Sequence, residues 1–554
     1  MFCDKPHVNQ LTSLLLAQGF VDIVVCPGSR NGILVHNFDA AKFCLHPVTD
    51  ERSAAFVGLG LCLSTHRPVA VCVTSGSALL NTIPAVAEAY YRQLPLLIIS
   101  ADRPKQWINQ LDGQTLQQKG ALEPYAKTYN IEEAHSPEEE HWNNLRMNEA
   151  ILSLHHYGNQ PVHLNVPITE PLFSFKTEHL PDVRCIKEEY PSVSQPLSAA
   201  TIASIQEAKF PIIVIGQYEK GEIEALDLIE SHNALLILPE IISGQKSAWR
   251  TTALEHLLPQ MDFHPDLVIH IGGNLVNKQL KLKLRKLSTC EVIRIENSRH
   301  LPDTFGHLQT VVRSTPEEVL LQLSQIKTRN AQVETFKQNL DIYRNQGEMY
   351  IPEHFSDLGI LQRIVRNIPE DCALQVGNSS VIRNVAYFFD HHSQHLFCNR
   401  GVNGIEGSLS VAVGYAMGHK GLSLSLIGDL SFFYDQNALW NTRLPRNLRI
   451  VLFNNGGGQI FYRLPGLDQT PSLSPYIAAA HQTSARGLAE SYGLTYLSAR
   501  NYEETDTAIS RLWKTESEQP MLLEVFTQTT DNENELKNIK LYYKNLFNYG
   551  KNME

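Results

Sequence analysis

Short apolar runs alternate with longer helical stretches along most of this chain, and this alternation restricts the possible folds more than any other feature. The runs "FVDIVVCPGS" (20–29), "PVAVCVTSGS" (68–77) and "LPLLIISADRP" (94–104) have the composition of buried strands that end in Gly-, Ser- or Pro-rich turns. Between two of them, "SALLNTIPAVAEAYYRQ" (77–93) predicts a helix. Continuously apolar strands joined by helices indicate a parallel sheet covered on both faces, so we expect an α/β fold built from doubly wound parallel sheets.

The same alternation occurs three times along the sequence. A second set of strands contains "PIIVIGQ", "ALLILPE", "DLVIHIGG" and "EVIRIEN", and a third contains "CALQVGNSS", "LSLSLIGDLS" and "LRIVLFNNGGG". A stretch mixing Pro, Ser and charge (169–200) separates the first two sets, and a charged helical stretch (332–346) separates the last two. We therefore predict three domains, at residues 1–178, 195–330 and 350–554, as expected for 554 residues at about 100–200 per domain.

Composition narrows the class of partner and compartment. A net charge of −11 argues against nucleic acid as a partner, because phosphate backbones select basic surfaces. The nine cysteines include no C-x-x-C pair, which favours reduced thiols in a cytoplasmic protein and argues against a zinc site. The N-terminus is too polar for a signal peptide, and the apolar runs are shorter than the roughly 20 residues that span a membrane. The histidine-rich stretch 390–395 is predicted to be an exposed loop.

The first and third domains have similar patterns. Residues 51–103 and 406–455 both show an acid, a helix with small residues, a strand, a second helix and a second strand. In each, 19 residues separate a glycine after the first strand from the start of the second, from 76 to 95 and from 428 to 447. The pattern alone leaves chance similarity equally open. A true duplication would suggest one cofactor held between two related domains.

The strongest local signal lies in the third domain. Gly428 and Asp429 end one predicted strand, and Asn454 and Asn455 end the next. The carboxyl ends of neighbouring parallel strands lie at one edge of a sheet, where open α/β folds bind ligands. A carboxylate, an amide and close glycine backbone (456–458) provide oxygen ligands for Mg²⁺ and room for a phosphate. A helix cap and an Asn-Gly turn would explain each residue separately, but their combined spacing favours the metal site.

This spacing resembles the diphosphate-binding motif of thiamine-diphosphate (ThDP) enzymes. The resemblance implies that Asp429, Asn455 and the backbone carbonyl of Gly457 bind Mg²⁺ or Mn²⁺, with Gly428 beside the cofactor. The family usually has Gly-Asp-Gly, whereas here the third position is Leu430. The family's domain order also fits: a pyrimidine-binding domain, a central domain and a diphosphate-binding domain.

A longer set of motifs makes the resemblance more specific. "CPGSR", "DERSA", "TSGSA", "ADRP", "GNSS", "NRGVNGIEG" and "NNGGGQIF" occur in order along the whole chain. Together they resemble the branch of the ThDP family that acts in menaquinone (vitamin K2) biosynthesis. That branch implies a transferase that decarboxylates 2-oxoglutarate and adds the resulting succinyl carbanion to isochorismate. It also implies a cytoplasmic homodimer as the minimal active unit, commonly assembled into a tetramer.

The stretch "PVTDERSAAFVG" (47–58) raises a separate question about Glu51. Acids in the first turn of a helix interact favourably with its dipole, so Asp50 and Glu51 could both be structural. By resemblance, however, Glu51 matches the acid that exchanges a proton with N1′ of the cofactor's aminopyrimidine ring, and Asp50 is left as the structural acid. The resemblance further implies that Ile405 separates the two cofactor rings and that Ile460 and Phe461 line the site near the reacting carbon.

Both implied substrates carry two carboxylates, which a net-acidic protein must meet with a locally basic pocket. A lone arginine is usually a solvated surface charge, but several here follow a strand end or a glycine turn. The residues that match the family's pocket are Ser29, Arg30, Arg103, Gln114, Lys278, Ser379, Arg383 and Arg400. Ser379 and Arg383 are four residues apart and would share a helix face. The sequence departs from the family pattern at Gly113, Gln279 and Gly456.

Two alternatives stay open at this point. One is another carboligase of the same fold, such as an acetolactate-synthase type that acts on a different 2-oxo acid. The other is a protein that keeps the fold but only binds its ligand. The basic residues argue against the first, and the presence of Glu51, Asp429 and Asn455 argues against the second.

Overall fold

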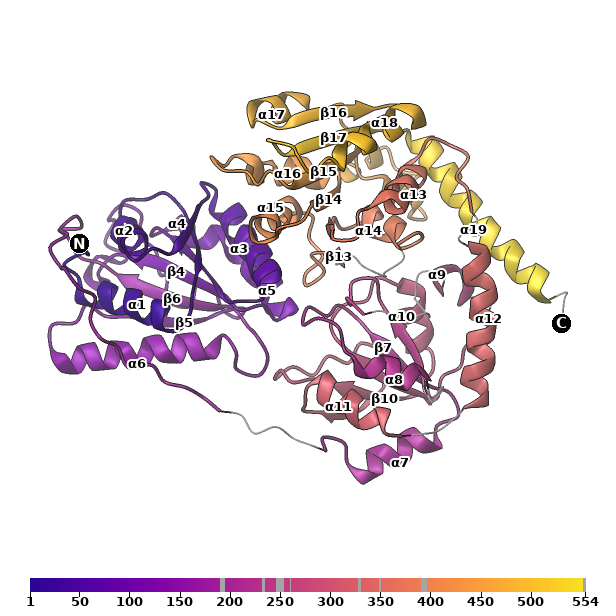
Figure 1. Ribbon diagram of the computed structural model, residues 1–554, viewed down its shortest axis with the longest axis horizontal. Helices are drawn as coiled ribbons and strands as arrows, with labels where there is room; N and C mark the ends of the chain where they lie inside the picture. Colours follow the sequence, from indigo (N-terminus) through magenta and orange to yellow (C-terminus); the bar gives the residue numbers. More distant parts are fainter. Residues whose placement is uncertain are drawn as a thin grey trace.

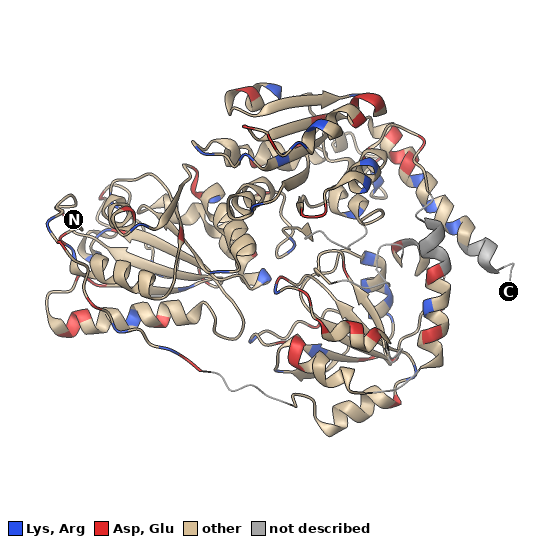
Figure 2. Cartoon of the chain, in the orientation of Figure 1, with Lys and Arg blue, Asp and Glu red and all other residues tan. Residues whose placement is uncertain are grey.

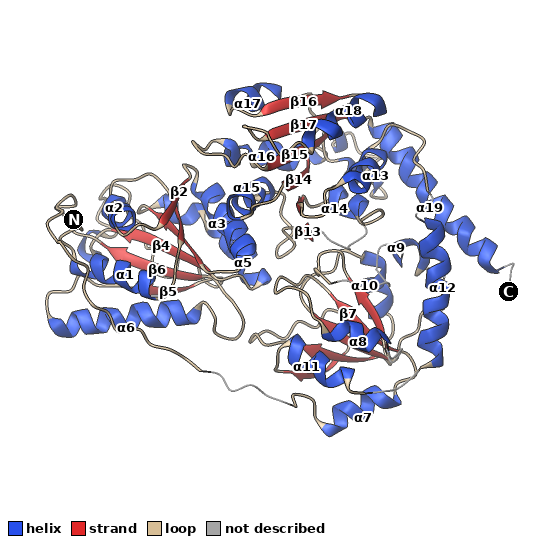
Figure 3. Ribbon diagram, in the orientation of Figure 1, coloured by secondary structure: helices blue, strands red, loops and turns tan. Residues whose placement is uncertain are grey.

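The structure is a computed structural model that describes residues 1–189, 195–231, 235–245, 254–259, 261–326, 330–347, 350–389 and 396–551. It has three separate parallel sheets, each flanked by helices, so the predicted α/β class is confirmed (Figures 1 and 3). The stretch 390–395, predicted to be an exposed loop, lies outside the described residues. Within the described ranges, no helix combines the length and apolarity needed to cross a membrane.

The N-terminal sheet has the order β2-β1-β3-β4-β6-β5, and all its strand pairs are parallel. Its strands are β1 (Asp22–Val25), β2 (Cys44–Pro47), β3 (Val69–Val73), β4 (Leu96–Asp102), β5 (Lys127–Asn130) and β6 (Val162–Pro167). One face is covered by α1 (Pro6–Ala17), α2 (Gly32–Ala40) and α6 (Pro137–Ser153), the other by α3 (Glu51–Thr65), α4 (Ser77–Asn81) and α5 (Ile83–Arg92). The helix predicted over 77–93 is thus two helices, which meet at Thr82 because Pro84 lacks the N–H needed to continue the first.

The central sheet has the order β11-β10-β9-β7-β8. Its strands are β7 (Pro211–Ile215), β8 (Leu236–Pro239), β9 (Leu267–Ile271), β10 (Glu291–Ile295) and β11 (Leu308–Val312). The helices of this region are α7 (Ala199–Glu207), α8 (Ala225–Ser231), α9 (Leu254–Leu257), α10 (Lys278–Arg285), α11 (Pro316–Ser324) and α12 (Ala331–Gly347). The four strands predicted here are all present, and α12 is the charged helix predicted to lead into the third set.

The C-terminal sheet has the order β13-β12-β14-β15-β17-β16. Its strands are β12 (Ala373–Val376), β13 (Leu396–Phe397), β14 (Ser423–Gly428), β15 (Leu448–Asn454), β16 (Thr495–Ala499) and β17 (Met521–Phe526). The accompanying helices are α13 (Asp357–Asn367), α14 (Ser380–Val385), α15 (Ser408–Gly418), α16 (Asp429–Tyr434), α17 (Arg486–Ser491), α18 (Tyr502–Leu512) and α19 (Thr529–Lys551). Short helical turns are η1 (Lys105–Trp107) in the N-terminal domain and η2 (Gln436–Leu439), η3 (Gln459–Arg463) and η4 (Leu473–Ile477) here.

The N-terminal and C-terminal sheets have the same topology. Numbered within its own sheet, each follows the order 2-1-3-4-6-5 in all-parallel pairing. Helices α3 and α15 are equivalent, since each comes between the second and third strands. The repeat inferred from the sequence pattern is therefore present in the fold.

These two equivalent helices also join the domains. Helix α3 crosses α15, and one apolar core runs from the N-terminal sheet through both helices to β14 and β15 (Figure 1). A Cβ atom added at Gly60 would lie 2.2 Å from the carbonyl oxygen of Val411, and one at Gly414 would lie 2.1 Å from that of Val57. The two backbones thus touch directly, which fixes the position of one domain on the other.

Candidate active site

Asp429 and Asn455 lie together at the carboxyl edge of the C-terminal sheet. Asp429 is the first residue of α16, directly after β14, and Asn455 directly follows β15. The buried Asp429 carboxylate accepts hydrogen bonds from the backbone N–H groups of Leu430 (2.7 Å), Asn455 (3.1 Å) and Gly457 (2.9 Å). Burial raises the pKa of Asp429 against the opposing effect of nearby His481. A carboxylate held this way is a fixed, buried negative charge with lone pairs still available to a cation.

The side chain of Asn455 is oriented by Asp357, a residue that no local pattern in the sequence indicated. Its Nδ2 donates a 2.9 Å hydrogen bond to the buried Asp357 carboxylate, which also accepts one from Thr527 Oγ1 at 2.6 Å. Burial raises the pKa of Asp357. The Oδ1 atom of Asn455 is buried and accepts no hydrogen bond from the described residues. An unsatisfied buried acceptor costs about 1–3 kcal/mol, so this oxygen beside Asp429 fits a site that a cation completes.

The glycine loop after Asn455 packs tightly. Gly457 has φ +139°, and a Cβ there would lie 2.7 Å from the carbonyl oxygen of Ala478. Its N–H donates to the Asp429 carboxylate, and its carbonyl oxygen accepts a 2.9 Å hydrogen bond from the N–H of Gln459. One lone pair of that carbonyl oxygen is then still available to a ligand. Gly428, the residue before Asp429, is partly buried at the end of β14. The loop therefore brings backbone amides and carbonyls, without side chains, close to the carboxylate.

His481 lies close to the carboxylate of Asp429. Its Nδ1 accepts a hydrogen bond from the backbone N–H of Thr483 at 3.1 Å, which assigns the ring proton to Nε2. Nε2 lies 3.4 Å from Oδ2 of Asp429. His481 was not among the predicted site residues, because nothing in the sequence around it connects it with residues some 50 positions earlier.

The two acids at the start of α3 have different environments. Asp50 is the N-cap: its Oδ1 accepts from the N–H of Ser53 (3.0 Å), and its Oδ2 from Nδ2 of Asn437 in η2 (2.8 Å). The structural role predicted for Asp50 is confirmed. Glu51 is the first helical residue, is half-buried, and accepts a long hydrogen bond of 3.4 Å from Asn81. Its carboxylate is thus weakly engaged and open to a ligand.

Arg30 and Arg103 form a pair of cations at the carboxyl edge of the N-terminal sheet. Arg30 is buried and donates to the carbonyl of Ile168 and to Glu170, 3.3 Å away. Arg103 donates to the carbonyl of Gly113 at 2.9 Å and lies 3.7 Å from the same Glu170 carboxylate. Burial, together with the nearby charge of Arg103, lowers the pKa of Arg30. Ser29 and Gln114, also predicted to bind substrate, are exposed beside this pair.

A second set of cations lies where the C-terminal and central domains meet. Arg400 donates to the carbonyl of Leu275 at 3.1 Å, and Lys278 begins α10 three residues later. The Arg383 side chain reaches solvent, yet desolvation by the surrounding protein and then the charge of Arg400 lower its pKa. Arg463 in η3, which was not predicted, adds a further positive charge that also lowers the pKa of Arg383.

Ser379 does not share a helix face with Arg383 as predicted. It is the N-cap of α14 with φ +71°, so it lies before the helix, where the backbone turns. The two residues still meet, because Nη1 of Arg383 donates to the carbonyl of Ser379 at 2.8 Å. None of the apolar residues predicted at the cofactor is fully buried. Ile405 is 38% exposed, and Ile460 and Phe461 in η3 are each partly exposed.

A buried glutamate of the N-terminal domain holds the loop that carries Arg400. Glu88 in α5 accepts hydrogen bonds from the backbone N–H groups of Gly401 (2.9 Å) and Val402 (2.8 Å). Arg92, one turn on, donates to Asn399 (3.0 Å) and to Glu219 of the central domain. Burial raises the pKa of Glu88. This ionic junction links all three domains and was not expected from the sequence.

Comparison with known proteins agrees with this geometry. Residues 7–123 match the family described as thiamine pyrophosphate enzyme, N-terminal TPP binding domain, and residues 375–525 match the corresponding C-terminal TPP binding domain. The fold is similar to that of benzoylformate decarboxylase from Polynucleobacter necessarius, with a TM-score of 0.72 over 96% of this chain and 99% of that one, at 16% identity. The chain is a thiamine-diphosphate enzyme by fold, thiamine diphosphate and thiamine pyrophosphate being the same compound.

The full-length relatives are more specific. The chain is 40% identical to 2-succinyl-5-enolpyruvyl-6-hydroxy-3-cyclohexene-1-carboxylate (SEPHCHC) synthase of Phocaeicola vulgatus, over 99% of this chain and 100% of that protein. It is 39% identical to the synthase of the same name from Bacteroides thetaiotaomicron (99% and 100%) and 35% identical to that of Flavobacterium johnsoniae (97% and 98%). The protein belongs to the SEPHCHC synthase family.

Proposed function

We propose that this protein joins 2-oxoglutarate to isochorismate, releasing CO₂ and forming SEPHCHC for menaquinone biosynthesis. Its full-length relatives are named for that product. One observation carries the chemistry: Asn455, whose backbone N–H donates to the buried carboxylate of Asp429, has a buried Oδ1 that no described residue satisfies, at the strand ends where this fold binds ligands. All nine cysteines are unpaired, which supports a reducing compartment, and we place the reaction in the cytoplasm.

The oxygen atoms at this edge suit a hard divalent cation. Asp429, Asn455 and the remaining lone pair of the Gly457 carbonyl would hold Mg²⁺ or Mn²⁺, which in turn would hold the diphosphate of the cofactor. When bound, thiamine diphosphate supplies the nucleophilic carbon that takes up a 2-oxo acid and allows it to lose CO₂. The protein has to position that carbon and exclude water around it.

Glu51 is the residue we assign to the cofactor's pyrimidine. Its neighbour Asp50 already caps the helix, and among the described residues the Glu51 carboxylate accepts one weak hydrogen bond, so it is available to hold a proton at N1′. Ile405, exposed by 38% and apolar, is suited to support the cofactor's bent shape, and Ile460 and Phe461 to line the reacting side.

The two groups of cations account for two dicarboxylates. Arg383 and Arg400, with Lys278 and Ser379 nearby, lie on the same domain as the proposed metal ligands. Arg463 lies between these cations and the metal ligands, since its charge acts on both Arg383 and Asp357. Burial lowers the pKa of Arg463, and the acids Glu533 and Asp357 oppose this shift. The second group, at the N-terminal sheet, is Arg30 and Arg103 with Ser29 and Gln114. Guanidinium groups bind planar carboxylates through paired hydrogen bonds, which favours a dicarboxylate over pyruvate.

We further propose that the protein is a homodimer that pairs into a tetramer, as the family resemblance implies, and that two chains share each site. In one chain, residues 434–437 of the C-terminal domain contact the start of α3, where Arg52 donates to the carbonyl of Tyr434 at 2.8 Å. The hydrogen bonds that the described residues make with the side chains of Asp429 and Asn455, in contrast, come from their own domain. A second chain would supply the Glu51 that faces them.

The reaction can be tested by absorbance. Purified protein with ThDP, Mg²⁺, 2-oxoglutarate and isochorismate should consume the isochorismate diene, and omission of any one component should stop the loss. Replacing 2-oxoglutarate by pyruvate should give little turnover, whereas efficient use of pyruvate would favour an acetolactate-synthase type. Arg383→Gln should raise the KM for 2-oxoglutarate, and Arg366→Gln, an exposed arginine of α13, is the matched control.

Subunit mixing tests the shared site. Glu51→Gln and Asp429→Asn should each be inactive alone. If each site takes Glu51 from one chain and Asp429 from the other, mixed dimers contain one intact site, and unfolding and refolding the two variants together should restore roughly a quarter of wild-type activity. No recovery, with mixed dimers demonstrated by mass, would place both residues in the same chain's site.

A further inference from the structure

Three side chains with metal-binding chemistry meet at the opposite edge of the N-terminal sheet from Glu51. Asp22 begins β1, and Cys44 and His46 lie on β2. In the parallel pairing of these strands Asp22 is opposite Cys44, and His46 is two residues further along β2, so all three side chains lie on one face of the pair. The local sequence gives no hint of this, because the cysteines follow no metal-binding spacing.

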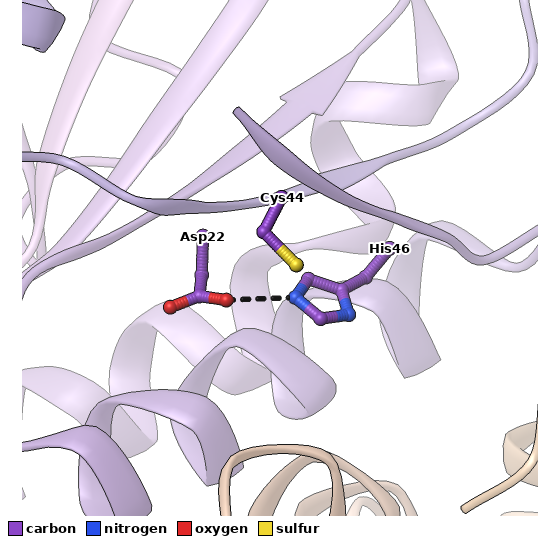
Figure 4. A group of neighbouring side chains, drawn as sticks. All are labelled: Asp22, Cys44 and His46. Carbon is purple, nitrogen blue, oxygen red and sulfur yellow. Dashed lines mark hydrogen bonds and ion pairs between the residues drawn. The ribbon is translucent and has the colours of Figure 1, made fainter. Parts of the chain in front are cut away.

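The three donor atoms are already close together. One oxygen of Asp22, the sulfur of Cys44 and a ring nitrogen of His46 all lie within 4.8 Å of one another. Figure 4 shows the Cys44 sulfur directed toward the gap between the other two side chains, with Oδ1 of Asp22 hydrogen-bonded to Nε2 of His46 at 2.9 Å. Asp22 and His46 are 11% and 14% exposed, whereas Cys44 is exposed to solvent. The group is therefore largely fixed by the fold and accessible from one side.

The donor types select a particular class of cation. A thiolate, an imidazole and a carboxylate together suit Zn²⁺ and similar borderline-soft ions, which take three protein ligands and a water in an open tetrahedral site. Arg67 lies 3.3 Å from the other oxygen of Asp22, and its side chain is 48% exposed. It can therefore stay on that oxygen and balance the charge of the ligands while Oδ1 turns to the metal.

We propose that Asp22, Cys44 and His46 form a zinc-class metal site, separate from the all-oxygen site at Asp429. The ion would replace the hydrogen bond between Asp22 and His46 and tie the edge strand β2 to β1. Strand β2 leads within a few residues to Glu51, so the site would stabilise the segment from which α3 begins.

Cobalt is a suitable probe because its thiolate complexes absorb in the near-ultraviolet, whereas complexes with oxygen ligands do not. The full-length protein, with the oxygen site first filled with ThDP and Mg²⁺, should give this absorption on addition of Co²⁺ and lose it on addition of Zn²⁺. Cys44→Ser should abolish the band, and His46→Gln should weaken Co²⁺ binding by about tenfold or more. Cys185→Ser is the control, since Cys185 is the other cysteine that is not buried.

A second measurement needs no variant. Zn²⁺ should slow the alkylation of Cys44, located by mass spectrometry, by about tenfold or more, because the metal-bound thiolate is no longer free to react. The alkylation of Cys185 should not change. Three results would each overturn the proposal. They are absence of the near-ultraviolet cobalt band, persistence of that band in Cys44→Ser, and an alkylation rate of Cys44 that Zn²⁺ does not change.

Discussion

Replacing Asp357 by asparagine should weaken the proposed Mg²⁺ site although both of its side-chain ligands, Asp429 and Asn455, are unchanged. The Asp357 carboxylate accepts one hydrogen bond from Asn455 Nδ2 and one from Thr527 Oγ1. An asparagine offers one oxygen and one NH₂ group. If the oxygen stays on Thr527, the NH₂ faces the NH₂ of Asn455, and the clash is relieved when the Asn455 amide rotates by half a turn. That rotation points nitrogen instead of Oδ1 toward the metal.

The expected loss of Mg²⁺ affinity follows from the loss of the hydrogen bond that orients the Asn455 side chain. A hydrogen bond to a charged group contributes about 1.5–3 kcal/mol, and each 1.4 kcal/mol is a factor of ten in affinity. Substitutions of residues that orient metal ligands typically weaken binding by about 10–100-fold. We therefore expect Asp357→Asn to raise the Mg²⁺ concentration for half-maximal activity by about 10–100-fold, with activity recovering at high Mg²⁺.

Magnesium titrations of activity at saturating ThDP and substrates would measure this. Thr527→Ser is the matched control, because it keeps a hydroxyl donor on the same carboxylate, and it should titrate like wild type. Melting curves without cofactor separate loss of binding from loss of folding. A wild-type magnesium requirement in folded Asp357→Asn would refute the idea that Asp357 sets the orientation of Asn455.

Four further changes test other parts of the structure. Glu51→Gln should abolish turnover while ThDP still binds, as checked by activity and calorimetry; wild-type turnover would exclude the proton role. Glu88→Gln keeps one acceptor for two backbone N–H groups, and kinetics should show KM for 2-oxoglutarate raised by roughly tenfold, with a smaller change in kcat. Burial raises the pKa of Glu240 to about 7, so between about pH 5 and 7 the folded protein holds a proton on Glu240 that the unfolded chain has lost. The free energy of unfolding should therefore fall by up to about 3 kcal/mol as the pH rises through this range. Melting curves of Glu240→Gln should lack this fall. Gly414→Ala should destabilise the protein by about 1–3 kcal/mol in melting experiments because of the backbone contact at that position, whereas Gly487→Ala, with open space around it, should not.

The strands that the sequence predicted are mostly apolar, although several contain a polar residue, such as His270 in β9. Strand β6 was missed because its six residues include both His163 and Asn165, yet His163 is fully buried and hydrogen-bonded to Ser100 and Thr128 of other segments. Glu524 interrupts β17 in the same way, and it is satisfied by distant donors that include Asn454. A buried polar residue is favourable only when its partners arrive through the fold, so the local pattern could not identify these strands.

The same limit applies to the candidate site. Asp429 and Asn455 could be paired from the sequence because they end consecutive strands, which the parallel topology brings together. Asp357 lies 98 residues from Asn455 and on a helix, so no spacing rule connects them. His481 approaches through a loop with no regular relation to the sheet. Residues placed by sheet topology were predictable, and residues that orient them from loops and helix starts were not.

Two kinds of contact hold the three domains together, and they imply different responses to substrate. The N-terminal and C-terminal domains meet backbone to backbone at Gly60 and Gly414, where there is no space for sliding. The central domain meets the C-terminal domain through apolar residues such as Ile242 and Val276, and also through polar contacts, among them Arg400 on the carbonyl of Leu275. Under the proposed function, substrate carboxylates would compete for the same cations, so binding would exchange these contacts for new ones. Adjustment to substrate is therefore expected where the central domain meets Arg400, while the contact between α3 and α15 keeps its geometry.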